Sequence, residues 1–167
     1  MPRNLKKCLI FAFNVIIFFS FSILHYSNLL NLKPFTVNVS LIIPLLAAFS
    51  IYHSPMASAL TGLLSGIIMD SSASGSYCFN AIILLIIGTF VSVSSNTLFN
   101  KNIPSAAVIS LISALFYFVM HWACFHIFSE GINQSLTFLL KHSLPSAIIT
   151  ALFIFPFYFL YRYIKKL

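Results

Sequence analysis

The chain has 167 residues, of which 60% are hydrophobic and only 7% are charged, and its net charge is +7. This composition excludes an ordinary soluble domain and indicates an integral membrane protein. The basic residues lie at the ends of apolar runs, which favours contacts with membrane lipids over nucleic-acid binding. The length allows about six spans of ~20 residues. We therefore expect an all-α fold in a single membrane domain, residues 1–167.

The first half of the chain predicts three helices, at residues 9–30, 36–52 and 55–70. Pro44 falls in the middle of the second run and predicts a kink. Ser54 followed by Pro55 is a typical helix start, with Ser54 as the N-cap. The third helix is only about 24 Å long at 1.5 Å per residue. We expect it to sit inside the bundle, because it is shorter than the hydrocarbon layer.

The second half predicts three more helices, at residues 79–96, 104–128 and 144–163. The connection from Ser129 to His142 contains leucines that suggest a short helix lying in the membrane interface. Pro156 predicts a kink in the last helix. The fifth helix carries a polar row at helical spacing, which is typical of packing between membrane helices: Ser110, Ser113, Tyr117, His121 and Cys124.

The distribution of Lys and Arg predicts the orientation. With the N-terminus in the cytoplasm, only Lys33 and Lys141 fall outside, whereas the other seven of the nine basic residues fall inside. We therefore expect a multi-pass protein of the bacterial inner membrane with both termini in the cytoplasm. Asp70 then lies at the outer end of the third helix.

Small residues form a stripe along the third helix. Ser58, Gly62, Gly66 and Asp70 are four apart and share one helical face. Such a face either packs into the core of the bundle or receives a helix of a partner protein. The carboxylate opposes the dipole at the end of its helix, so it needs a cation, backbone donors from residues 71–76, or a partner. A second interpretation places Asp70 in the wet interface as a loop residue.

Candidate catalytic and metal residues do not form a recognisable site. A serine protease of the membrane would need a glycine where Leu63 precedes Ser65-Gly66. Four possible metal ligands gather towards the outer ends of the fifth and sixth helices but lack the spacing of metal ligands: His121, His126, Glu130 and His142. We therefore expect no enzymatic activity, no metal and no cofactor.

The pattern Gly62-x-x-x-Gly66-x-x-x-Asp70, a loop with Gly75, and then Asn80-Ala81 resembles the rod shape-determining protein MreD family. The chain departs from it at Cys78-Phe79, where the family often has a second loop glycine. The resemblance implies a fold similar to the S components of energy-coupling-factor transporters. It also implies a non-enzymatic scaffold of the bacterial elongation machinery, supporting rod shape and lateral peptidoglycan synthesis. The expected helix-packing or partner-binding residues are Ser58, Gly62, Gly66, Asp70 and Asn80.

The expected partners follow from the same resemblance. They are an MreC-like single-span protein, RodA, a penicillin-binding transpeptidase and, indirectly, the MreB filament. The alternative function is a vitamin-binding S component. Against it, the first helix has only Ala12 and lacks an A-x-x-x-A pair, and the outer loops offer few polar and aromatic groups for a pocket. An intramembrane enzyme acting through Ser65 or Asp70 is a third class.

Overall fold

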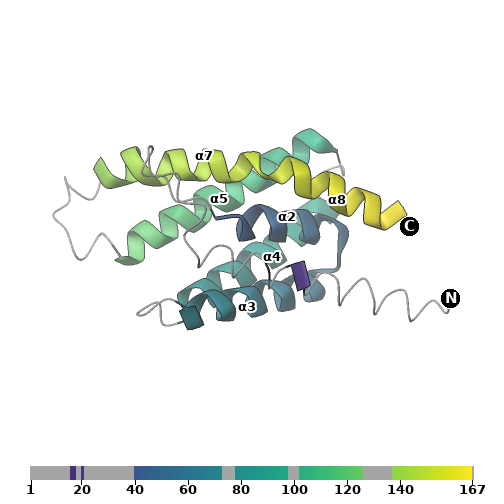
Figure 1. Ribbon diagram of the computed structural model, residues 1–167, viewed down its shortest axis with the longest axis horizontal. Coiled ribbons are helices and arrows are strands. Elements are labelled where there is room, and N and C mark those ends of the chain that lie inside the picture. Colours follow the sequence, from purple (N-terminus) through teal and green to yellow (C-terminus); the bar gives the residue numbers. More distant parts are fainter. Residues whose placement is uncertain are drawn as a thin grey trace.

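The computed structural model describes residues 16–17, 20, 40–72, 78–97, 102–125 and 137–166. Every regular element in these ranges is a helix, which confirms the expected all-α class. The predicted helix at 9–30 lies outside the described residues, apart from residues 16, 17 and 20. The helices are α2 (Ile42–Tyr52), α3 (Pro55–Ser72), α4 (Phe79–Thr97), α5 (Ile103–Phe125), the π-helix η2 (Leu139–Ser143), α7 (Leu144–Leu152) and α8 (Ile154–Lys166) (Figure 1).

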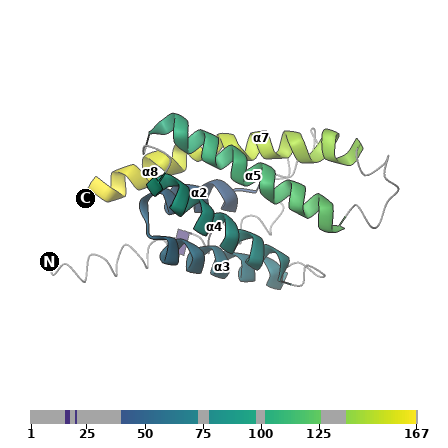
Figure 2. The same ribbon diagram turned by 180° about the vertical axis from the view of Figure 1, so that it is seen from behind.

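The helices form two layers with α2 between them. The pair α3 and α4 makes one layer, and α5 with the long rod of α7 and α8 makes the other, as the two opposite views show (Figures 1 and 2). The helix α2 contacts α3, α4, α5, α7 and α8. Each layer therefore meets the other largely through this short central helix.

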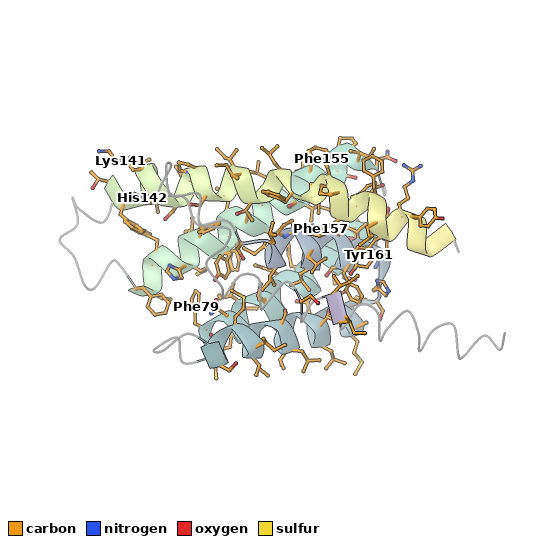
Figure 3. The ribbon with its side chains drawn as sticks, viewed as in Figure 1. Phe79, Lys141, His142, Phe155, Phe157 and Tyr161 are labelled. Carbon is orange, nitrogen blue, oxygen red and sulfur yellow. The ribbon has the colours of Figure 1, made fainter. Side chains whose placement is uncertain are left out.

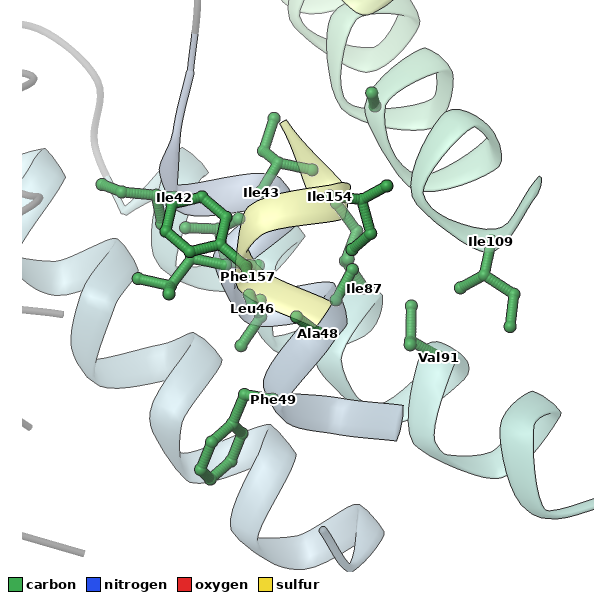
Figure 4. Close-up of a cluster of buried hydrophobic side chains, with 14 of the residues drawn as sticks. Ile42, Ile43, Leu46, Ala48, Phe49, Ile87, Val91, Ile109, Ile154 and Phe157 are labelled. Carbon is green, nitrogen blue, oxygen red and sulfur yellow. The ribbon is translucent and has the colours of Figure 1, made fainter. Parts of the chain in front are cut away.

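The sequence of α2 explains its central place. Ten consecutive residues, from Ile42 to Ile51, are buried. A helix that is apolar on all sides is stable only when it is surrounded by other apolar groups. Phe49 and its neighbours on α2 pack with Ile87 and Val91 of α4 and with Ile154 and Phe157 of α8 (Figure 4).

The boundaries of α2 correct one expectation. The helix begins at Ile42, so Pro44 lies in its first turn and not in its middle. A first-turn N–H has no partner within the helix, so a proline there removes no hydrogen bond. The predicted kink at Pro44 was therefore wrong.

The start of α3 agrees with the sequence pattern. The helix begins at Pro55, and the Ser54 hydroxyl accepts a hydrogen bond from the N–H of Ala57 at 3.5 Å. The Ser54 carbonyl accepts from the N–H of Ser58 at 3.0 Å. Ser54 is thus the N-cap that the sequence predicted.

The last predicted helix starts earlier than expected. Residues 137–138 are already helical, and the five residues of η2 lead without a break into α7. A short interfacial helix was expected in the connection from Ser129 to His142, on the leucines Leu136, Leu139 and Leu140. Of this connection the structure describes residues 137–142, and a π-turn carries Lys141 and His142 into the same rod as α7 (Figure 3). Residues 129–136 lie outside the described part, so the expectation stays a prediction there. The rod is interrupted at Phe153, between α7 and α8. Pro156 explains the break, because its ring clashes with the carbonyl four residues earlier, that of Leu152.

Three helices of the described part are long and apolar enough to cross a membrane: Phe79–Thr97, Ile103–Phe125 and Leu139–Tyr163. The chain is therefore compatible with a membrane protein. The helix α3 has 18 residues but is not among them, and α2 is a shorter apolar helix.

Candidate functional site

The small residues of α3 face α4 and let the two helix backbones touch. A Cβ atom placed on Gly66 would lie 2.6 Å from the carbonyl carbon of Asn80 and closer still to the backbone of Ala81. A Cβ atom on Gly62 would lie 2.8 Å from the carbonyl carbon of Leu84. Real Cβ atoms do not approach backbone atoms so closely, so only glycine allows this distance between the helices. Small residues serve this purpose in membrane helix pairs.

The contact is reciprocal. A Cβ atom on Gly88 of α4 would lie 2.5 Å from the carbonyl oxygen of Ser58 on α3. As the residue number increases along α3, the number of the contacting residue on α4 decreases, from Gly88 to Leu84 to Ala81. The two helices are therefore antiparallel. We call this contact the α3–α4 seam; Ser58, Gly62, Gly66 and Asp70 contribute from α3, and Asn80, Ala81, Leu84, Gly88 and Ser92 contribute from α4.

Asp70 closes one end of the α3–α4 seam. Its carboxylate accepts hydrogen bonds from the backbone N–H of Asn80 at 3.2 Å, from the Asn80 side-chain amide at 2.9 Å and from the backbone N–H of Ala81 at 2.9 Å. The two backbone groups belong to the first turn of α4, where N–H groups have no partner within the helix. Asp70 therefore caps α4 from outside. The positive end of the α4 dipole offsets its unfavourable place at the end of α3.

The donors of Asp70 differ from the three sources that the sequence suggested. Among the described residues they lie at the start of α4, whereas the sequence pointed to residues 71–76, a cation or a partner protein. Residues 73–77 lie outside the described part of the chain. Asp70 belongs to the helix α3 and is half-buried, so the interpretation as a loop residue was wrong, whereas its place in the wet interface stays a prediction.

Asn80 extends this network to α5. Its side-chain oxygen accepts a hydrogen bond from the Tyr117 hydroxyl at 2.7 Å, while its side-chain nitrogen donates to Asp70. Asn80 and Tyr117 are each 7% exposed. In such surroundings an unmade hydrogen bond is costly, so the three side chains hold α3, α4 and α5 in one arrangement.

Aromatic rings surround this end of the α3–α4 seam. The Phe79 ring lies 5.8 Å from the His121 ring and 5.2 Å from the Phe125 ring, in edge-to-face contacts. The Tyr117 ring stacks with the His121 ring at 6.3 Å. The polar row predicted on α5 is therefore only partly inside the bundle. Its residues Ser110, Ser113 and Tyr117 are buried, His121 is half-buried and Cys124 is exposed.

A second hydrogen bond closes the opposite end of the α3–α4 seam. The Ser92 hydroxyl donates to the carbonyl of His53 at 2.7 Å. The His53 ring stacks on Phe49 with a centroid distance of 3.9 Å, and Tyr161 of α8 contacts both rings edge-on. The turn between α2 and α3 is thereby joined to α4 and to α8.

The structure brings all five sequence-predicted site residues, Ser58, Gly62, Gly66, Asp70 and Asn80, into the α3–α4 seam. Sequence reasoning missed Gly88 and Ser92, and it placed Tyr117 in the packing row of α5 without its hydrogen bond to Asn80. A signal for the first two was present, because Asn80, Leu84, Gly88 and Ser92 are spaced four apart and form a complementary stripe on α4.

The other face of α3 is exposed in the part of the chain that the structure describes. Met56, Leu60, Leu64 and Ile67 are 75%, 52%, 48% and 48% exposed. They lie about two residues out of phase with the seam residues, which places them on the opposite side of the helix. Most of residues 1–39 lie outside the described part, so the expectation that α3 sits inside the bundle stays a prediction for this face. We call these four residues the outer face of α3.

The structure describes only some of the residues considered for chemistry. The Ser65 hydroxyl is 1% exposed and donates to the carbonyl of Gly62 at 2.9 Å. No group of three His, Cys, Asp or Glu residues gathers within the ranges that the structure describes, and His126 and Glu130 lie outside them. What the arrangement does is hold three helices together through backbone contact and one capped carboxylate.

Comparisons with family models, curated proteins and solved structures found no match for this chain.

Proposed function

We propose that this chain is a non-enzymatic scaffold subunit of the bacterial elongation machinery, of the MreD type. It would support rod shape and lateral peptidoglycan synthesis. The observation that carries the proposal is the convergence of Gly62, Gly66, Asp70, Asn80 and Ala81 in the α3–α4 seam. These are the residues on which the resemblance to the family rests. Their role in joining helices suits a protein that acts by presenting a rigid membrane surface.

The partner helix binds the outer face of α3 in this proposal. The α3–α4 seam is already filled by α4, so it has no room for another helix. The outer face of α3, by contrast, exposes four large apolar side chains on a helix that is not among the most apolar ones. A helix of modest hydropathy is better accommodated against protein than against lipid on all sides. The single span of an MreC-like protein would pack there.

We further propose six spans in the bacterial inner membrane with both termini in the cytoplasm. The three helices that are long and apolar enough to cross a membrane, together with α2, α3 and the apolar run at 9–30, make up this number. RodA and a penicillin-binding transpeptidase would assemble beside the scaffold. The MreB filament would be reached through the partner.

The test is a depletion experiment in the bacterium that carries this chain, with plasmid-borne variants. Loss of the chain should convert rods into round cells. The double variant Leu60→Ala/Leu64→Ala should fail to restore rods, because it removes bulk from the outer face of α3. The matched control Ile148→Ala/Leu152→Ala trims two exposed residues of α7, 54% and 58% exposed, and should restore them.

Thermal unfolding in detergent must show that both double variants remain folded, so that a loss of shape reports on binding. Rods in cells depleted of the chain would contradict the proposed function. Rods with the outer-face variant, when depletion alone gives round cells, would contradict only the place of the partner helix.

A further inference from the structure

An apolar crevice lies between α4 and α5, away from the α3–α4 seam. It has a volume of about 160 Å³. We call it the α4–α5 crevice; its lining residues are Ile86, Ile87, Phe90, Ile112, Ser113 and Phe116. These two helices are two of the three that are apolar and long enough to cross a membrane.

The walls and the floor of the crevice differ in exposure. Ile86, Phe90 and Ile112 are 42%, 56% and 44% exposed and form its rim. Ser113 and Ile87 are each 3% exposed and form its floor. The crevice therefore opens sideways from the bundle toward the surroundings of the two helices.

The chemistry of the crevice selects an apolar occupant. The lining is hydrocarbon except for Ser113, whose hydroxyl already donates to the carbonyl of Ile109 at 2.8 Å. The one hydroxyl of the lining has therefore already used its proton within α5, so the lining side chains offer no free donor to a water or a headgroup. A cavity of about 150 Å³ lined by Leu, Ile and Phe in another protein stays free of water and takes up benzene. This crevice has a similar size and lining.

The position of the crevice identifies the source of that apolar group. Ile87 lies near the middle of α4 (Phe79–Thr97), and Ser113 lies near the middle of α5 (Ile103–Phe125). At that depth in a bilayer the neighbouring molecules are lipid tails, whereas headgroups lie at the helix ends. The volume is too small for a whole helix, whose diameter is about 10 Å with side chains. Ile17, from the apolar run at 9–30, packs against the buried cluster around α2 and is not a lining residue.

We propose that a segment of a lipid acyl chain inserts into the α4–α5 crevice and completes the packing between α4 and α5. The proposal does not depend on the scaffold role proposed above, but it rests on the placement of α4 and α5 in a membrane that was proposed with it. It assigns a lipid-binding role to the six lining residues, with Ile87 and Ser113 as the contacts that only an inserted chain can reach.

The test uses the full-length protein in vesicles of phosphatidylcholine with a trace of the same lipid carrying a diazirine halfway along one acyl chain. After illumination, peptide mass spectrometry maps the labelled residues. An inserted chain labels the floor residue Ile87, whereas Leu84, which is fully buried on the same helix outside the crevice, stays unlabelled. Surface lipid alone labels only the rim.

The variant Ser113→Leu fills the floor and should abolish the label on Ile87 while the rim label persists. The matched variant Val119→Leu lies on α5 outside the crevice, where Val119 is 40% exposed, and should keep the label on Ile87. Label confined to the rim of the wild-type protein would overturn the proposal.

Discussion

Replacing Asp70 by asparagine isolates the role of its charge. The substitution keeps the shape of the side chain but leaves one acceptor oxygen in place of two. In the unmodified chain the N–H of Ala81 donates to one carboxylate oxygen at 2.9 Å. If the remaining oxygen of the variant keeps the bonds from Asn80, the new amide nitrogen takes the place of that acceptor. A donor then meets a donor, and the first turn of α4 also loses its neighbouring negative charge.

The magnitude follows from these losses. A hydrogen bond to a charged group contributes about 1.5–3 kcal/mol. The favourable interaction of the charge with the α4 dipole, about 0.3–1 kcal/mol, is balanced by a similar relief at the end of α3. We expect Asp70→Asn to lower the free energy of unfolding by about 2 kcal/mol. For a protein of this size that corresponds to a fall in Tm of about 4–8 °C.

The assay is thermal unfolding in a mild detergent, together with titration by a denaturing detergent for the free energy. The matched control is Ser71→Ala, since Ser71 is exposed and its hydroxyl donates only to the carbonyl of Ile68 in its own helix. The control should change stability by less than about 0.5 kcal/mol. If Asp70→Asn is no less stable than Ser71→Ala, the capping role of Asp70 is refuted.

Three further changes probe the rest of the α3–α4 seam and its link to α5. Gly66→Ala should destabilise by about 1–3 kcal/mol because the new methyl group meets the backbone of α4, whereas Leu64→Ala on the outer face should have little effect on unfolding. Ser92→Ala should cost about 1 kcal/mol through loss of the bond that joins α4 to the α2–α3 turn, and Thr97→Ala, whose hydroxyl bonds within α4, serves as its control. Tyr117→Phe should cost about 1 kcal/mol alone. Combined with Asp70→Asn it should cost less than the sum, because both act through the same amide; strict additivity would show that no shared network exists.

The helix class and most helix starts could be predicted because their signals are local. Ser54-Pro55 marks the start of α3, and the structure places the start there. The small-residue stripe predicted a close helix contact for the same reason. Its partner could not be predicted from the stripe alone, because small residues require a close backbone without specifying which one. The complementary spacing of Asn80, Leu84, Gly88 and Ser92 carried that missing information.

Other features depend on tertiary surroundings. An all-apolar run such as α2 reads the same whether protein or lipid surrounds it, so its central burial was not predictable from hydropathy. Lys141 and His142 read as loop residues, yet the π-turn of η2 carries them within a continuous rod. The capping of α4 by Asp70 was missed, because the backbone N–H groups that donate to the carboxylate leave no trace in residue types.

Affinity purification of the detergent-solubilised protein, with mass spectrometry of bound proteins and bound small molecules, tests the proposed scaffold function most directly. The scaffold account predicts recovery of a single-span MreC-like protein, lost with Leu60→Ala/Leu64→Ala and kept with Ile148→Ala/Leu152→Ala. Recovery of a stoichiometric vitamin with an ATPase module, and of no single-span partner, would contradict it and make the chain a transporter subunit.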